Sequence, residues 1–200
     1  MKRPARVPFP IVTLALAAAI VAAFGVELAG DGQAFCERFG FVAAHPSLRT
    51  ALSSLFVHDP STFVHVGGNL AVLVLIGSRV EQAIGSTRFA ALYLAGGLAG
   101  TALHVVVDPS STAPLVGASG SLFAVLAIAA ALFGPGMLAS TAVLVAMNVA
   151  HAFGGPGDAG MSFGAHIGGF TLGVLLALLA RARGLDLRLR AARAVAASPW

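Results

Sequence analysis

The sequence predicts an all-α membrane protein whose chain crosses the bilayer as six helices. Only 10% of its 200 residues are charged, whereas soluble domains carry about 25%, and its mean hydropathy is +0.90. One small core cannot remove that much apolar surface from water, so lipid is the expected solvent. The same composition excludes a disordered chain, and the single cysteine, Cys36, excludes a disulfide scaffold.

Six apolar runs come close to the length of about 20 residues that a helix needs to cross the hydrocarbon core. The first follows three basic residues and has no clear A-x-A cleavage site, so we expect an anchor and not a signal peptide. The second is the shortest and the most polar. The six runs are residues 9–26, 63–78, 89–107, 114–133, 137–153 and 161–180.

The basic residues are distributed asymmetrically between the two sides that these runs define. The N-terminus, the 77–88 loop and the chain after residue 180 hold ten of the twelve Lys and Arg residues. The other side has only Arg38 and Arg49, together with six of the eight acidic residues. The positive-inside rule therefore predicts that both termini are cytoplasmic.

No change in composition marks a second domain. We expect one membrane domain over residues 1–180 and a short basic cytoplasmic tail over 181–200 that lies on anionic lipid. Residues 27–62 are the one long connection, and their mixture of aromatic, aliphatic and polar side chains predicts an amphipathic, partly membrane-embedded structure on the outer side. The net charge of +4 comes without a basic groove interleaved with aromatic residues, so nucleic acid is not an expected partner.

Polar side chains within the spans are costly in lipid and become functional candidates. The second, fourth and sixth predicted spans run from outside to inside, so residues early in each lie at the same outer depth. Four polar side chains share that depth, because each lies within about two turns of its helix start. They are His65, Asn69, Ser119 and His166. A serine and a histidine at one depth indicate nucleophilic catalysis.

Ser119 lies in the sequence Gly117-Ala118-Ser119-Gly120, where the glycines permit close backbone approach. His166 is the best-placed base by depth. The free N–H groups at the helix start, with Asn69 and His65, are the expected donors to an oxyanion. No Asp or Glu shares this depth, which favours a dyad over a triad.

Gly169 and Gly173 recur at four-residue spacing and give the last predicted span a smooth face. We expect this face to pack on the side of the fourth span that carries Gly117, Gly120 and Ala124, because small residues let helices approach closely. Packing and catalysis then share one interface.

Four sequence elements occur in order on the expected spans, and their combination is specific. They are His65-Val-Gly-Gly-Asn69, Gly77-Ser-Arg-Val-Glu81-Gln-Ala-Ile-Gly85, the 117–120 box and Ala165-His166-Ile-Gly-Gly169-Phe-Thr-Leu-Gly173. Together they resemble the rhomboid family of intramembrane serine proteases over nearly the whole six-span core. The resemblance implies a rhomboid-like bundle that hydrolyses a peptide bond in or near the transmembrane helix of another membrane protein.

The resemblance also implies roles for single residues. Ser119 is the nucleophile, His166 is the general base and acid, and Asn69, His65 and the Ser119 N–H hold the oxyanion. The supporting residues are Gly117, Ala118, Gly120, Phe123 and Gly169. The 27–62 segment corresponds to the membrane-embedded first loop, and the fifth span with its adjoining loop to a gate for the substrate.

The chain departs from the family pattern in three places. Phe123 stands where members often have a tyrosine beside the histidine, and its apolar ring can take over the packing role. The stretch from His58 to His65 is longer than usual, and the first loop lacks the Trp-Arg pair of some members. None of these departures removes a catalytic atom.

Plainer interpretations remain open for several polar residues. His65 is either an oxyanion donor or a structural histidine that binds a loop carbonyl. Glu81 is expected to be structural, either capping a helix or pairing near Arg79 and Arg88. Asn148 and His151 are expected to join helices or face outer water, and His45, His58 and His104 to be solvated.

Rival chemistries find little support. The sequence Gly155-Pro-Gly157-Asp158 matches the GxGD of intramembrane aspartyl proteases, but it lies in a loop and no span carries a partner aspartate. H-E-x-x-H does not occur and the histidines lack a paired carboxylate or cysteine cluster, so we expect neither a metal nor a cofactor. A transporter would need charged residues along a midplane pathway or a repeat with broken helices.

A catalytically silent rhomboid-like protein, which binds transmembrane helices and directs their folding or degradation, is the alternative function. The expected partners are transmembrane protein substrates and the lipid bilayer, and the sequence does not indicate an oligomeric state. The short, positively charged N-terminus favours a bacterial plasma membrane, with the site open to the extracytoplasmic side.

Overall fold

The computed structural model describes residues 9–61, 63–137, 139, 141–142 and 163–187. In this part of the chain the regular elements are helices, and an isolated antiparallel bridge pairs Phe41 with Leu115 in the segments between them. The helices are α1 (Ile11–Ala29), α2 (Gly32–Phe39), α3 (Leu48–Ser53), α4 (Phe63–Val72), the π-helical turn η1 (Leu73–Gly77), α5 (Ser78–Ile84), α6 (Ser86–Val107), α7 (Ser119–Phe133) and α9 (Phe163–Ala182).

Four of these helical segments are long and apolar enough to cross a membrane: α1, the continuous stretch Phe63–Ile84, α6 and α9. The α7 helix is apolar but shorter, with 15 residues. The predicted all-α, multi-pass membrane protein is thus confirmed. The number of six crossings and the cytoplasmic termini stay predictions, because most of the 137–153 run lies outside the described residues.

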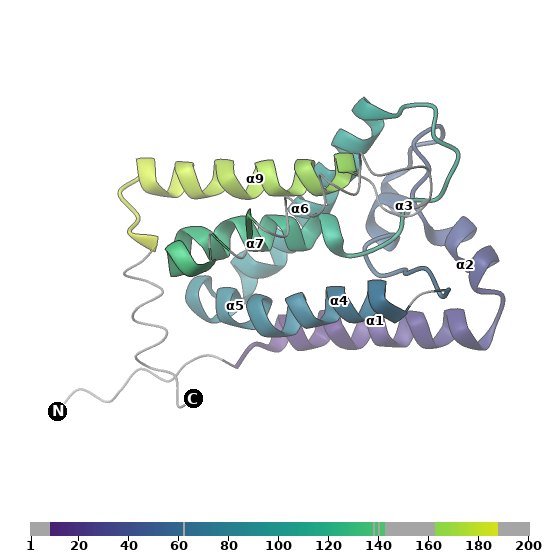
Figure 1. Ribbon diagram of the computed structural model, residues 1–200, viewed down its shortest axis with the longest axis horizontal. Coiled ribbons are helices and arrows are strands. Elements are labelled where there is room, and N and C mark those ends of the chain that lie inside the picture. The colour runs from purple at the N-terminus through teal and green to yellow at the C-terminus, as the bar shows by residue number, and fades with distance from the viewer. Residues whose placement is uncertain (1–8, 62, 138, 140, 143–162, 188–200) are drawn as a thin grey trace.

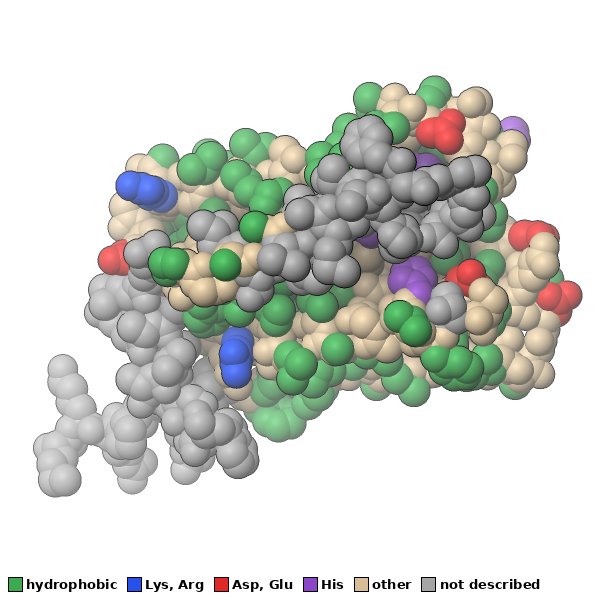
Figure 2. Space-filling view, in the orientation of Figure 1, with side chains coloured by type: hydrophobic (Ala, Val, Ile, Leu, Met, Phe, Trp, Pro, Cys, Tyr) green, Lys and Arg blue, Asp and Glu red, His purple; other side chains and the backbone are tan. Residues whose placement is uncertain are grey.

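The surface is what a lipid environment requires. Large apolar side chains of α1, α6 and α9 are exposed, among them Val21, Val106 and Leu178. On the face drawn in Figure 2 apolar side chains cover much of the helical surface, most acidic side chains gather at the α2 end and the basic ones lie at the opposite end. This asymmetry follows the one in the sequence.

The α6, α7 and α9 helices pack side by side, with α9 along one edge of the molecule (Figure 1). The α7 helix is buried along most of its length and is lined by small residues. A methyl group at Gly100 would lie 2.6 Å from the carbonyl oxygen of Ala165, and one at Gly169 would collide with the carbonyl oxygen of Gly120. The three backbones therefore touch where side chains would normally separate them.

Glu81 ties the first helix to the second membrane segment. Its buried carboxylate accepts hydrogen bonds from Val12 N (3.0 Å), Thr13 N (2.7 Å), Thr13 Oγ1 (2.7 Å) and Ser86 Oγ (2.6 Å). Two of these donors are N–H groups of the first turn of α1, which have no partner within the helix. The role is therefore capping, and within the described residues no ion pair joins Glu81 to Arg79 or Arg88.

The segment between α1 and α4 is hydrogen-bonded to the residues that precede α7 in the sequence. Phe41 and Leu115 exchange both backbone hydrogen bonds (2.9 and 2.7 Å), and Gly117 N donates to Ser54 O at 2.9 Å. The expectation that the helix begins at residue 114 is wrong, since these bonds hold the chain out of the helix until Ser119. Gly117 has φ +117°, a backbone conformation that favours glycine.

Gly169→Ala is expected to lower the stability of the folded protein. The new methyl group meets backbone that cannot rotate away, so α7 and α9 must separate, at a cost of at least about 1–3 kcal/mol. Gly25→Ala is the matched control, because it is also helical and a methyl group there meets nothing within 4 Å. The midpoint of unfolding in detergent should fall for Gly169→Ala alone. Equal midpoints for the two variants would contradict the packing described here.

Candidate active site

The structure brings Ser119 and His166 together. Ser119 is the first residue of α7 and is partly exposed, whereas His166 lies in the first turn of α9 and is 3% exposed. The Ser119 Oγ and His166 Nε2 atoms are 2.6 Å apart. A hydroxyl that donates to a neutral imidazole at this distance can transfer its proton as the oxygen attacks an electrophile.

Phe123 holds the imidazole from one side. Its ring stacks on that of His166 with centroids 4.5 Å apart and planes at 13°. Because Phe123 is one turn after Ser119 on α7, the same helix carries the hydroxyl and the surface that orients its partner. The apolar ring thus packs beside the histidine as the sequence indicated.

The small residues around Ser119 explain how the two side chains meet. Ala165, which precedes His166, places its carbonyl oxygen 2.6 Å from a methyl group built at Gly100 and 3.3 Å from one built at Gly120. The start of α9 therefore comes this close to α6 because residue 100 is glycine, and Gly120 makes a tight contact with the same carbonyl from α7. Ala118 is fully buried behind Ser119.

Asn69 and His65 lie on the other side of the turn before Ser119. Both come from α4, one turn apart, and Asn69 is 7% exposed. A methyl group at Gly117 would lie 2.9 Å from His65 Nε2 and 3.7 Å from Asn69 Nδ2. The α4, α7 and α9 helices start at the same end of the molecule (Figure 1), so four of the predicted site residues converge there.

His58 is a part of this region that the sequence did not reveal. It was expected to be solvated, but it is 0% exposed, and its Nε2 lies 3.0 Å from Asn69 Nδ2. Burial, together with the nearby His65, lowers the pKa of His58 to about 4. His58 lies between Val57 and Asp59 in a segment without regular periodicity, so the long-range contact could not be inferred.

Other polar residues fall outside the site. His104 on α6 is 9% exposed, so its expected solvation is wrong, whereas His45 is exposed as expected. Asn148, His151 and the 155–158 sequence lie outside the described residues. Over the described ranges no group of three or more His, Cys, Asp or Glu side chains is placed to hold a metal ion.

The helices and the serine–histidine pair define a class, a multi-pass membrane protein with a polar site buried at one end of its bundle. Comparison with known families identifies the chain further. The model of the Rhomboid domain matches residues 45–183, which is more than half of the chain. The protein belongs to the rhomboid family.

Several known proteins are similar to parts of the chain. RHOMBOID-like protein 5 of Arabidopsis thaliana is 31% identical over 136 residues, which is 64% of this chain and 43% of the relative. Rhomboid-related protein 3 of Homo sapiens is 36% identical over 86 residues, 41% of this chain and 20% of the relative. Rhomboid-type serine protease 2 of Emericella nidulans is 32% identical over 129 residues, 62% of this chain and 25% of the relative. The matched region is therefore less than half the length of each relative.

The burial of His58 predicts that the stability of the folded protein depends on pH. Since its pKa is about 4 in the folded protein and about 6.5 when unfolded, the unfolded state alone takes up the proton between these values. Stability is therefore lost as the pH falls from about 6.5 to about 4, by up to about 3 kcal/mol.

Denaturant unfolding at about pH 7 and about pH 5 measures this effect. The loss of stability on acidification should be smaller in His58→Gln than in the wild type. His45→Gln, which changes an exposed histidine, is the control and should behave like the wild type. An equal loss in both variants would show that His58 does not titrate as described.

Proposed function

We propose that the chain is an intramembrane serine protease that uses Ser119 and His166 as a catalytic dyad. The observation that carries the proposal is the 2.6 Å contact between the Ser119 hydroxyl and the His166 imidazole, two groups that are 47 residues apart in the sequence. Buried polar groups are costly inside a membrane protein, and a pair aligned for proton transfer is the arrangement that acyl transfer needs.

In the proposed reaction His166 Nε2 takes the Ser119 proton while Oγ forms a bond to the carbonyl carbon of the substrate. The negative charge moves to the carbonyl oxygen, where the Ser119 N–H and the Asn69 amide donate hydrogen bonds, with His65 as a further donor. His166 then protonates the leaving amine. A water, from which His166 takes a proton, attacks the acyl-enzyme, and His166 returns that proton to Ser119 Oγ as the ester bond breaks.

The start of α7 suits the developing charge. The first N–H groups of a helix have no partner within it, and the helix dipole places partial positive charge there. Because α7 begins at Ser119 and not earlier, these groups lie beside the nucleophile. The Phe41–Leu115 bridge and the hydrogen bond from Gly117 N to Ser54 O fix the non-helical backbone before Ser119 and keep the helix start at this residue.

The proposed substrates are transmembrane proteins, cut in or near their membrane helices. The helices around the site expose large apolar side chains, and such surfaces are suited to contact with the membrane helix of another protein. We further propose that the protein lies in a bacterial plasma membrane with both termini cytoplasmic and the site opening to the extracytoplasmic side. The distribution of basic residues supports this orientation.

Labelling with a fluorophosphonate probe tests the proposal without a known substrate. The folded wild-type protein should be labelled, whereas Ser119→Ala and His166→Ala should not be. Asn69→Ala should react more slowly, by about 10²–10³-fold if it loses one oxyanion donor. Ser121→Ala is the matched control, since Ser121 is a buried serine on the same helix and should leave labelling unchanged.

Cleavage of a transmembrane reporter protein by the same variants extends the test to proteolysis. It should be lost with Ser119→Ala and His166→Ala and retained with Ser121→Ala. A folded wild-type protein that is neither labelled nor able to cleave the reporter would overturn the proposal. That result would favour the alternative, a catalytically silent rhomboid-like protein that binds transmembrane helices.

A further inference from the structure

We propose that His58 is a positioning residue, which fixes the orientation of the Asn69 side-chain amide so that Asn69 presents an N–H group to the oxyanion. This inference rests on the proposed function. His58 contacts no reacting atom, and its ring is hydrogen-bonded to Asn69 within the site. A chain of donors and acceptors runs from the carbonyl of Phe56 through His58 and Asn69 to the turn before Ser119.

The carbonyl of Phe56 determines which nitrogen of the His58 ring carries the hydrogen. Its Nδ1 atom lies 3.3 Å from the carbonyl oxygen of Phe56, which can only accept a hydrogen bond. The ring is fully buried, and its low pKa keeps it neutral at pH 7. A neutral imidazole carries one hydrogen, so Nδ1 holds it and Nε2 is an acceptor.

The His58 ring in turn determines the orientation of the Asn69 side-chain amide. His58 Nε2 lies 3.0 Å from Asn69 Nδ2. An acceptor at this place selects the nitrogen of the amide, whereas a flipped amide would put the Asn69 oxygen against a lone pair. One N–H of the amide is used by His58, and the second is fixed in direction by the planar group.

The oriented amide faces the place where the oxyanion is proposed to form. Asn69 Nδ2 lies 3.7 Å from a methyl group built at Gly117, so the amide nitrogen faces the turn that leads into Ser119. A flipped amide would present its oxygen, which repels an oxyanion. The orientation of the amide therefore decides whether Asn69 presents a hydrogen-bond donor or an acceptor at the position where negative charge develops.

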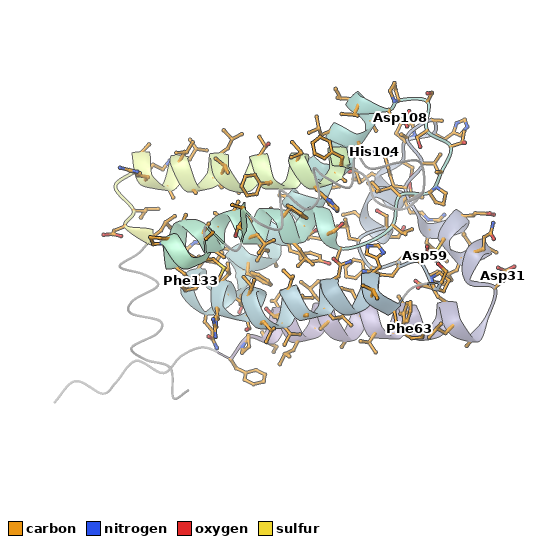
Figure 3. All side chains as sticks on the ribbon, in the orientation of Figure 1. Asp31, Asp59, Phe63, His104, Asp108 and Phe133 are labelled. Carbon is orange, nitrogen blue, oxygen red and sulfur yellow. The ribbon has the colours of Figure 1, made fainter. Side chains whose placement is uncertain are left out.

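The position of His58 itself is set by the first two helices. Its backbone N–H donates to Glu27 Oε1 of α1 at 3.2 Å, and the Cys36 thiol of α2 lies 3.5 Å from its carbonyl oxygen. The ring also packs edge-on against that of His65, with centroids 5.2 Å apart. Figure 3 shows the neighbouring Asp59 close to the start of α4, at the end of the molecule that carries α2. These contacts exist before any substrate binds.

The test compares two replacements of His58 in the wild type and in Asn69→Ala. His58→Phe keeps the ring but has no acceptor, and His58→Gln keeps an acceptor oxygen. With the transmembrane reporter as substrate, His58→Phe should lower kcat by about tenfold or more while KM changes little, because the oxyanion forms only in the transition state. His58→Gln should recover much of this loss.

A double-mutant comparison separates positioning from a general loss of structure. In the Asn69→Ala background, His58→Phe should cause no further fall in kcat, since the two residues act as a unit. The inference is overturned if folded His58→Phe has the kcat of the wild type, or if its effect multiplies with that of Asn69→Ala. An inactive wild-type protein would instead overturn the proposed function, and this inference with it.

A second measurement applies even where His58→Phe does not fold. Nitrogen-15 NMR of the histidine rings in the wild-type protein reports which ring nitrogen carries hydrogen, and the His58 signals are those that disappear in His58→Gln. The result expected is a protonated Nδ1 and an unprotonated Nε2. A hydrogen on Nε2 would remove the acceptor and overturn the inference, whether or not the protein is a protease.

Discussion

The contact between the backbones of α7 and α9 is the constraint on which the rest of the structure depends. Gly169 faces the carbonyl oxygen of Gly120 with no room for a side chain. In lipid no hydrophobic force holds helices together, so the close van der Waals packing that small residues permit stabilises the contact. This approach sets the depth at which the start of α9 meets the start of α7. The 2.6 Å separation of Ser119 and His166 is its direct result, and Phe123 then stacks on the imidazole from the same helix.

The segment between α1 and α4 provides the second half of the arrangement. Its bonds to Leu115 and Gly117 hold the chain out of the helix until α7 begins, and its buried His58 links Glu27 of α1 to Asn69 of α4. At the other end of α1, Glu81 accepts the N–H groups of the first turn. The Glu81 carboxylate and the His58 ring thus each have a hydrogen-bond partner on another helix, which a protein in lipid requires because water cannot replace the partner.

Much of the fold and of the candidate site could be predicted from the sequence. The features that could not be predicted have one physical reason in common. Apolar runs and the glycine pattern at residues 169 and 173 predicted the helices and their close packing, since both signals are local. Depth along the helices predicted that Ser119, His166, Asn69 and His65 converge. The start of α7 was placed too early because a bridge to Phe41 decides it, and His58 was taken as solvated because its burial comes from α1 and α2. Contacts that join distant segments outside regular periodicity leave no trace in a single sequence.

The structure of the protein after reaction with a fluorophosphonate would test the central claim, that the helix contact creates an activated Ser119 facing an oxyanion site. The account predicts phosphorus bonded to Ser119 Oγ, with the phosphoryl oxygen within hydrogen-bond distance of the Ser119 N–H and Asn69 Nδ2, and with His166 Nε2 still beside Oγ. An adduct on another residue would contradict the account. So would an adduct on Ser119 whose phosphoryl oxygen points away from Asn69 and the start of α7.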